Sequence, residues 1–248
     1  MKNQLNSFWR KYLNFDWRFG LILLLIICIV RFFLVLKANV ESNYSAISYI
    51  MILSALTPFI FLSKQGRKET GLVKPKNPIW LLYAFFIGIL LASLLFLAGY
   101  LLYAHSIENW YVYIGNSYKI PQEITGKEKF IFFLIVAATG MIFSPIGEEL
   151  FFRGIIHNSF SNSIGEKKAS IIDSSAFALT HLSHFGIIYV SGVWKFLFVP
   201  SLFWMAGMFI SSLIFFQSRK KSGSILGAIL CHAGFNLGMI FYIFYCLN

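Results

Sequence analysis

The sequence predicts an all-α fold, a polytopic membrane bundle of seven to eight transmembrane helices, on three observations. Of the 248 residues, 58% are hydrophobic and only 12% are charged, about half the charged share of a soluble globular domain. Long apolar runs recur along the chain, each near the ~20 residues that a helix needs to cross a bilayer. Lys and Arg residues gather in short segments between those runs, as they do where membrane topology is set. We therefore expect a single integral membrane domain over residues 1–248.

Hydrophobicity marks seven strong candidate spans in order along the chain. They cover residues 20–36, 44–63, 78–104, 130–159, 169–185, 198–217 and 223–247. The segment 186–197, "GIIYVSGVWKFL", is apolar but too short to cross a bilayer. It is either a re-entrant or interfacial piece, or it joins its neighbours to form an eighth helix. The stretch 105–129 carries interfacial aromatic residues and is expected to lie along the membrane surface.

The positions of Lys and Arg predict the orientation. With a cytoplasmic N-terminus, 14 of these residues are cytoplasmic and 5 are external, and Arg31 and Arg153 remain inside spans. The cytoplasmic residues are Lys2, Arg10, Lys11, Arg18, Lys64, Arg67, Lys68, Lys74, Lys76, Lys167, Lys168, Arg219, Lys220 and Lys221; the external ones are Lys37, Lys119, Lys127, Lys129 and Lys195. We expect a multi-pass protein of the cell membrane with its N-terminus in the cytoplasm. The same placement argues against a nucleic-acid partner, although a net charge of +11 would suit phosphate binding.

Two adjacent carboxylates, Glu148 and Glu149, are the only acidic residues well within a span. Burying a carboxylate at mid-bilayer costs at least ~2.5 kcal/mol, so such a residue usually faces a partner or a wet cavity. Arg153 follows Glu149 by four positions, so the two share a helical face and can pair. The corresponding neighbour of Glu148 is Phe152. We therefore expect Glu148 to be available for function, whereas the Glu149–Arg153 pair either supports a site or only locks helix packing.

Histidines in two other spans lie at a similar depth. His181 follows Phe177 by four positions, and Asn236 follows His232 by four. At ~1.5 Å per residue, Glu148, His181 and His232 lie about 16, 18 and 14 Å from the cytoplasmic ends of their helices. This agreement predicts a single buried site built from three helices.

A carboxylate, two imidazoles and a carboxamide in an apolar cavity are suited to hydrolysis. A glutamate can act as a general base toward water, and a histidine can hold that water or protonate the leaving amine. A second histidine with an asparagine can stabilise an oxyanion, an effect of ~3–4 kcal/mol per donor. Alternatively, Glu148, His181 and His232 would bind zinc, which would activate water in the same place. The spacing does not separate these alternatives, because the residues come from three helices.

Three short motifs together resemble those of the CPBP family of intramembrane proteases. "EELFFR" at 148–153, "FALTH" at 177–181 and "HAGFN" at 232–236 are similar to the EExxxR, FxxxH and HxxxN motifs of that family. It includes the Ras-converting CAAX endopeptidases of eukaryotes and bacterial members linked to bacteriocin immunity and peptide maturation. The resemblance covers about residues 140–240 and implies an eight-helix-type fold with a catalytic core at about 130–248.

The resemblance also implies a role for each matching residue. Glu148 would activate water, and His181 would help to position it. His232 and Asn236 would stabilise the oxyanion.

Glu149 and Arg153 would support the site, and Phe177 is counted with them as the first residue of its motif. Members of the family have been described both as metalloproteases and as metal-free glutamate proteases. We favour the metal-free mechanism, with zinc as the alternative. Zinc usually takes three strong protein ligands, and the site offers two His and one Glu, which would leave no separate base unless Glu149 or His184 served. The sequence leaves His184 open as an interfacial residue, a residue supporting the site, or an extra ligand.

The expected function is therefore cleavage of a membrane-associated peptide, prenylated or of leader type, near the cytoplasmic half of the bilayer. The partners would be a membrane-bound peptide or protein substrate and the lipid bilayer, and the oligomeric state is left open. One alternative is a non-catalytic bacteriocin immunity or peptide-binding protein. Another is a proton-coupled transporter, since intramembrane Glu, His and Arg also line such pathways, but the sequence shows no repeated halves.

Overall fold

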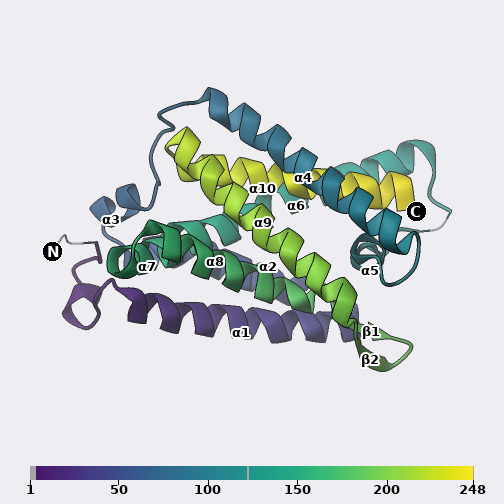
Figure 1. Ribbon diagram of the computed structural model, residues 1–248, viewed down its shortest axis with the longest axis horizontal. Coiled ribbons are helices and arrows are strands. Elements are labelled where there is room, and N and C mark those ends of the chain that lie inside the picture. The colour runs from purple at the N-terminus through teal and green to yellow at the C-terminus, as the bar shows by residue number, and fades with distance from the viewer. Residues whose placement is uncertain (1–3, 122, 248) are drawn as a thin grey trace.

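The computed structural model describes residues 4–121 and 123–247, so Lys2, one of the residues used for orientation, lies outside the description. Its elements in chain order are α1 (Trp17–Glu41), α2 (Ser45–Phe61), α3 (Lys64–Glu69), α4 (Ile79–Tyr103), α5 (Trp110–Asn116), α6 (Gly126–Glu149), α7 (His157–Ile164), α8 (Glu166–Thr180), β1 (Ile187–Val190), β2 (Val193–Phe196), α9 (Phe198–Ser222) and α10 (Ile225–Tyr242). Short 3-10 turns lie at Trp9–Lys11 and His181–Ser183, and π-helical segments at Leu150–Ile156 and Ile243–Leu247. The expected all-α membrane bundle is confirmed (Figure 1).

Five helical segments of the described chain are long and apolar enough to cross a membrane. They are Trp17–Glu41, Ile79–Tyr103, Gly126–Ile164, Phe198–Ser222 and Ile225–Leu247. The other two expected spans are shorter, since α2 has 17 residues and α8 has 15. The span expected at 169–185 stops being α-helical at Thr180, because a 3-10 turn begins at His181. The chain is a multi-pass membrane protein in which α6 and α7 form one continuous helical segment.

The segment 186–197 does not form an eighth helix. It folds into an antiparallel hairpin in which Ile187 pairs with Phe196 and Val190 with Val193. Ser191 and Gly192 form the two-residue turn with φ of 52° and 81°, as expected for a tight hairpin turn with positive φ at both positions. The flanking residues are β-branched or aromatic, which favours strands over helix. This segment therefore does not supply the eighth helix that was one of its two expected forms.

The stretch 105–129 also differs from the expected surface segment. Within it, α5 turns its aromatic residues inward, and Trp110 and Tyr111 are 1% and 0% exposed. The indole nitrogen of Trp110 donates to the Leu95 carbonyl, and the Tyr111 hydroxyl donates to that of Ala92. These two contacts anchor α5 to α4.

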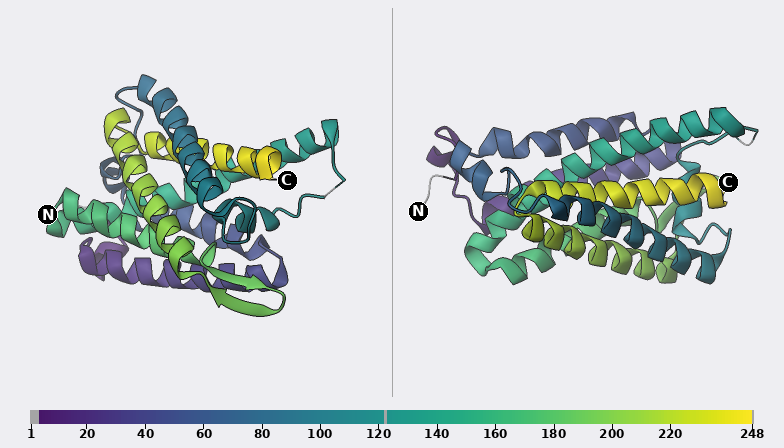
Figure 2. Two further views of the ribbon diagram at one scale, coloured as in Figure 1. Left: turned by 45° about the vertical axis from the view of Figure 1, so that its right-hand side comes forward. Right: turned by 90° about the horizontal axis from the view of Figure 1, so that it is seen from above.

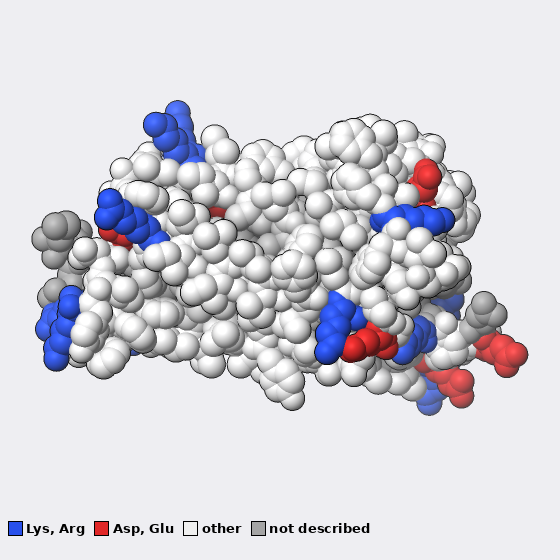
Figure 3. Space-filling model, turned by 90° about the horizontal axis from the view of Figure 1, so that it is seen from below, with Lys and Arg blue, Asp and Glu red and all other residues white. Residues whose placement is uncertain are grey.

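The bundle has two ends of different charge. The first, called here the basic end, comprises the N-terminal segment, α3, the α7–α8 turn and the α9–α10 turn. The opposite end, called here the far end, comprises α5, the β1–β2 hairpin and the C-terminal turn (Figures 1 and 2). On the face drawn in Figure 3, charged side chains gather toward these two ends and leave an uncharged band between them. This band is what a helix bundle in a lipid bilayer presents.

Glycines allow α4 and α10 to pack with their backbones in contact. A Cβ atom built on Gly88 would lie 1.9 Å from the Cys231 carbonyl oxygen, and one on Gly234 would lie 2.0 Å from that of Phe85. Small residues at helix interfaces are the usual means of such close approach in membranes. This packing holds α10, which carries His232 and Asn236, firmly against its neighbour.

We predict that Gly88→Ala lowers stability by about 1–3 kcal/mol through overpacking. The direction of the stability change distinguishes overpacking from helix propensity, because helix propensity alone would make the Ala variant more stable than the Gly protein by about 1 kcal/mol. Leu90→Ala is the control on the same helix, since Leu90 is 58% exposed. Thermal unfolding in detergent measures both variants. A higher midpoint for Gly88→Ala would contradict the tight α4–α10 contact.

Candidate active site

One cavity brings together the residues singled out by the sequence. It has a volume of about 410 Å³ and is lined by Glu148, His181, His232 and Asn236, with Phe177 and His184 beside them. Glu148 comes from α6, His181 from the end of α8, and the other two predicted catalytic residues from α10. The expectation of one buried site from three helices thus agrees with the geometry.

Glu148 has two partners for one of its carboxylate oxygens. Its Oε1 accepts a hydrogen bond from Arg31 Nη2 at 2.9 Å and one from Ser144 Oγ at 2.5 Å. Glu148 and Arg31 are only 1% and 4% exposed. The cation comes from α1, which packs against the π-helical turn that follows Glu149. An unpaired charge in an apolar interior would be costly, and each group here supplies the opposite charge to the other.

Sequence reasoning missed the role of Arg31. The residue lies inside the first span, outside the region at about 140–240 that carries the three motifs. The available signal was an arginine in the middle of an apolar run, since such a residue usually faces the bundle interior and a partner. Its partner lies 117 positions away, which no local spacing indicates.

The second oxygen of Glu148 faces His181. Oε2 lies 3.9 Å from His181 Nε2 and has no hydrogen-bond partner in the described structure. The other ring nitrogen, Nδ1, lies 2.7 Å from the Phe177 carbonyl oxygen. A carbonyl oxygen only accepts, so Nδ1 carries the hydrogen and Nε2 of the neutral ring is an acceptor. Two acceptors thus face each other across a short gap inside the cavity.

The predicted Glu149–Arg153 pair is confirmed. Arg153 Nε lies 3.2 Å from Glu149 Oε2, and Arg153 Nη1 donates to Oε1 at 3.2 Å. Both side chains are fully buried. Glu149 Oε1 also lies 2.9 Å from Nδ1 of His232. An ionised carboxylate has no hydrogen to donate, so His232 Nδ1 is the donor of this hydrogen bond. Glu149 therefore joins α6 to α10 and orients the ring of His232.

The pair lies where the long helix changes form. The segment Leu150–Ile156, which contains Arg153, is π-helical and wholly buried. Single π-helical turns inside α-helices occur frequently at functional sites. Here the wider turn directly follows the two glutamates.

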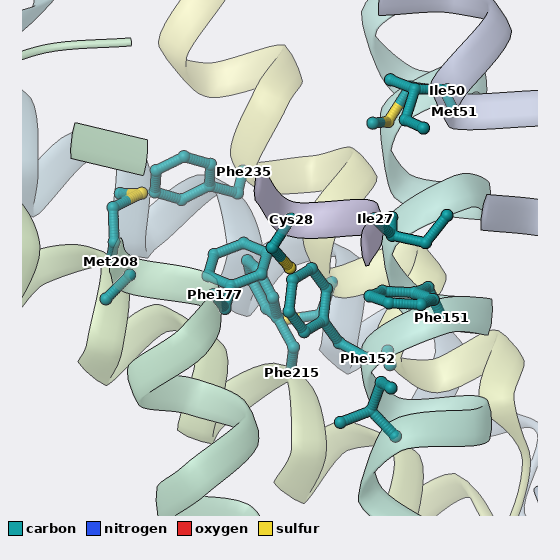
Figure 4. Packing of buried hydrophobic residues seen from close by; sticks show 14 of the residues in the cluster. Ile27, Cys28, Ile50, Met51, Phe151, Phe152, Phe177, Met208, Phe215 and Phe235 are labelled. Atoms are coloured by element: carbon teal, nitrogen blue, oxygen red, sulfur yellow. The ribbon is translucent and has the colours of Figure 1, made fainter. Parts of the chain in front are cut away.

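Aromatic rings surround the Arg153 guanidinium. Its central carbon lies 4.6 Å from the ring centre of Phe177, 5.5 Å from that of Phe215 and 5.8 Å from that of Phe152. These rings lie close together in Figure 4, and such cation–π contacts strengthen where water is excluded. The same rings contact the histidines, since Phe215 stacks on His232 at 4.7 Å and Phe177 lies 4.3 Å from His181. Phe177 thus packs between Arg153 and His181.

A buried polar chain continues from Arg153 toward the basic end. Arg153 Nη2 donates to the carbonyl and hydroxyl oxygens of Ser212, and the Ser212 hydroxyl donates to Ser174 Oγ at 2.8 Å. Ser174 donates to Asp173 Oδ1 at 3.2 Å, and Asp173 Oδ2 pairs with His157 Nδ1 at 2.7 Å. All five side chains are buried. The chain fills the bundle between the cavity and the basic end with satisfied polar groups.

Asn236 and His184 complete the wall of the cavity. Asn236 Nδ2 donates to the Gly140 carbonyl at 2.8 Å, which uses one of its two amide hydrogens. His184 lies beside Arg31, with Nε2 3.5 Å from Nη2, and its ring centre is 5.5 Å from that of His181. His184 therefore lies behind the Glu148–His181 gap, next to the arginine that holds Glu148.

The zinc alternative names Glu148, His181 and His232 as ligands. Among the described residues, no group of three or more His, Cys, Asp or Glu side chains is placed to hold a metal ion. The Nδ1 atoms of His181 and His232 both face protein oxygens. A zinc site needs three or four ligands converging at about 2 Å. Because each Nδ1 is used in its contact with a protein oxygen, Nε2 is the atom that each ring leaves for a water molecule or a metal ion, and the metal-free mechanism is treated as a proposal.

Comparison with known proteins bears on the half of the chain that holds the three motifs. Residues 130–238 match the family described as type II CAAX prenyl endopeptidase Rce1-like. No curated protein and no solved structure matches the chain. The matched region extends from α6 into α10 and contains Glu148, His181, His232 and Asn236. Over this region, the chain is similar to the Rce1-like, CAAX-protease (CPBP) family.

Proposed function

We propose that the protein is an intramembrane endopeptidase that hydrolyses a peptide bond of a membrane-associated peptide with water activated by Glu148 and without a metal. Similarity to a protease family supports hydrolysis in general. The observation that carries the mechanism is the gap of 3.9 Å between Glu148 Oε2 and His181 Nε2 inside the cavity.

A single water molecule fits this gap. Its oxygen can lie about 2.8 Å from both acceptors, and its two hydrogens then point to Glu148 Oε2 and His181 Nε2. The lone pairs of the water are left facing away from both, toward the cavity. That orientation suits nucleophilic attack on a peptide carbonyl carbon, because position and orientation supply much of the catalytic advantage.

The reaction balances with these groups alone. As the water oxygen attacks the carbonyl carbon, one of its protons passes to Glu148 Oε2 and the carbonyl π electrons move to oxygen. The tetrahedral intermediate then collapses, the C–N bond breaks, and the leaving amine takes the proton from Glu148. The products are a carboxylic acid and an amine, and Glu148 returns to its ionised form.

Negative charge moves from Glu148 to the substrate oxygen during the attack. The second amide hydrogen of Asn236 is available for this oxyanion, and His232 can donate from Nε2 when its ring carries both protons. Glu149 receives the other ring hydrogen and so fixes the direction of Nε2. Arg31 holds Glu148 Oε1 throughout, so that Oε2 stays directed at His181.

The first prediction is that Glu148→Gln reduces cleavage of a membrane peptide by about 10²–10⁴-fold, the usual contribution of a general base. An amide has nearly the same shape but does not accept the proton. Purified protein in detergent would be assayed on a prenylated CAAX peptide and on a leader-type peptide. Glu128→Gln, at an exposed position in the first turn of the same helix, is the matched control.

The same assay distinguishes a metal enzyme. We expect wild-type cleavage to persist after treatment with a zinc chelator, with metal content measured on the same sample. Loss of activity on chelation and its return with zinc would contradict the metal-free mechanism. Equal cleavage by wild type and Glu148→Gln would contradict the role of Glu148 and favour a peptide-binding or transport protein.

The second prediction concerns Arg31. Replacing it by Gln removes one partner of a buried ion pair, a change that typically costs about 3–5 kcal/mol of folding stability. Because Glu148 would lose the contact that directs Oε2 toward His181, we also expect kcat to fall and KM to change less. Arg31→Lys keeps the charge and should recover part of kcat. Arg18→Gln, exposed at the start of the same helix, is the control. If kcat is unchanged in Arg31→Gln while the protein stays folded, Arg31 does not position Glu148.

A further inference from the structure

A second cavity lies at the far end of the bundle. Its volume is about 310 Å³. Most of its lining side chains are polar but uncharged at neutral pH, and no Asp, Glu, Lys or Arg of the described chain is among them. The lining residues are Asn39, Ser42, Tyr44, Ile107, Tyr113, Ile114, Asn116, Ser117, His184, Tyr189, Val190 and Ser191. This composition suits a neutral, hydrogen-bonding ligand.

The second cavity adjoins the catalytic one. Tyr44, Ile114, Ser117 and His184 line both. His184 also lies 3.5 Å from Arg31, and Arg31 in turn donates to the Glu148 carboxylate. One residue therefore separates the shared wall from Glu148. The two cavities therefore form neighbouring chambers, and the outer one is more polar.

Hydrogen bonds connect the shared wall to the catalytic histidine. The Tyr44 hydroxyl donates to Asn39 Oδ1 at 2.7 Å, and Asn39 Nδ2 donates to the Ser183 carbonyl at 2.9 Å. Ser183 belongs to the 3-10 turn that begins with His181. A ligand that displaces the Tyr44 hydroxyl would thus act directly on the turn that carries His181.

The two cavities lie away from the basic end. Within the described chain, neither cavity is lined by the N-terminal segment, α3, α7 or the α9–α10 turn. The space on that side holds the buried chain from Arg153 to His157, whose members are at most 3% exposed. A buried polar segment therefore separates both cavities from the basic end.

The two chambers also differ in the chemistry that they accept. Apart from the paired Arg31 and Glu148, the catalytic cavity is walled largely by apolar side chains such as Met51, Phe143 and Met208. An extended peptide that occupies both chambers would place apolar residues there and neutral polar residues in the outer chamber. The far end and the helix ends and loops beside it (residues 37–41, 105–129 and 187–196) are nearly balanced in charge, with five Lys against four Glu, so a strongly charged substrate has no counterpart.

We propose that the substrate of the proposed protease enters from the far end, with a neutral polar segment in the second cavity and its apolar, membrane-anchored segment beside Glu148. Because Lys- and Arg-rich ends of membrane helices face the cytoplasm, the far end is external. The substrate is then a membrane-anchored peptide exposed outside the membrane, not a cytoplasmic tail. This differs from the cleavage near the cytoplasmic half of the bilayer that the sequence suggested, and it rests on the proposed function.

Cysteine labelling tests the route without any need for catalysis. In a Cys246→Ser background, Ser117→Cys tests the shared wall, Lys37→Cys an exposed site at the far end, and Lys168→Cys an exposed site at the basic end. Right-side-out vesicles are treated with a membrane-impermeant maleimide. We expect Ser117→Cys and Lys37→Cys to react in sealed vesicles and Lys168→Cys only after permeabilisation. Labelling of Ser117→Cys only from the cytoplasmic side would overturn the proposal.

Cleavage then tests occupancy. Labelled Ser117→Cys should cleave a model peptide at least about tenfold more slowly than the same variant without the label, because the adduct occupies the space where the two cavities meet. Labelled Lys37→Cys should cleave the peptide at the rate of its unlabelled sample. A peptide with a Ser/Asn-rich polar segment should show at least about tenfold higher kcat/KM than one with two Asp residues in that segment. Equal rates in either comparison would overturn the proposal. If unlabelled protein cleaves neither peptide while the labelling pattern holds, the proposed protease function fails and the accessible far-end wall stands.

Discussion

The buried ion pair between Glu149 and Arg153 is the contact on which the arrangement of the site depends. Two full charges inside an apolar bundle are tolerated only when each is paired and hydrogen-bonded, since removing one partner of a buried pair typically costs about 3–5 kcal/mol. Arg153 satisfies this condition through Glu149, Ser212 and the rings of Phe152, Phe177 and Phe215. Because these partners come from α6, α8, α9 and the π-helical turn, the helices must assemble in one register to bury the arginine. His232 and His181 are then held against the same rings.

Two neighbouring glutamates therefore have different roles for a structural reason. Both oxygens of Glu149 lie within hydrogen-bonding range of Arg153, and one also receives His232. Glu148 points to the other side of the helix, where Arg31 and Ser144 hold only one oxygen. Its second oxygen is left facing His181 across the cavity. One carboxylate is committed to structure, and the other keeps an acceptor free for chemistry.

Much of the site could be read from the sequence because its decisive spacings are local. Glu149 and Arg153, Phe177 and His181, and His232 and Asn236 each lie four apart, and an α-helix brings such residues onto one face whatever surrounds it. Arg31 could not be assigned in this way, since its pairing with Glu148 depends on how α1 packs against the π-helical turn that follows α6. The far-end hairpin was missed for a related reason. Its two apolar strands have only four residues each. The positive φ of Ser191 and Gly192 is what distinguishes a hairpin turn from a helix here.

The sequence by itself determined that this protein is an all-α membrane bundle and which three helices carry its unusual polar residues, because hydrophobicity and helical periodicity are properties of each segment alone. The tertiary structure alone decided which charge pairs with Glu148, which nitrogen of His181 carries the hydrogen, and that two chambers of different polarity meet at Tyr44, Ser117 and His184. These features arise from contacts between helices that are far apart along the chain. In an apolar interior, such contacts are set by the need to satisfy every buried charge and polar atom at once.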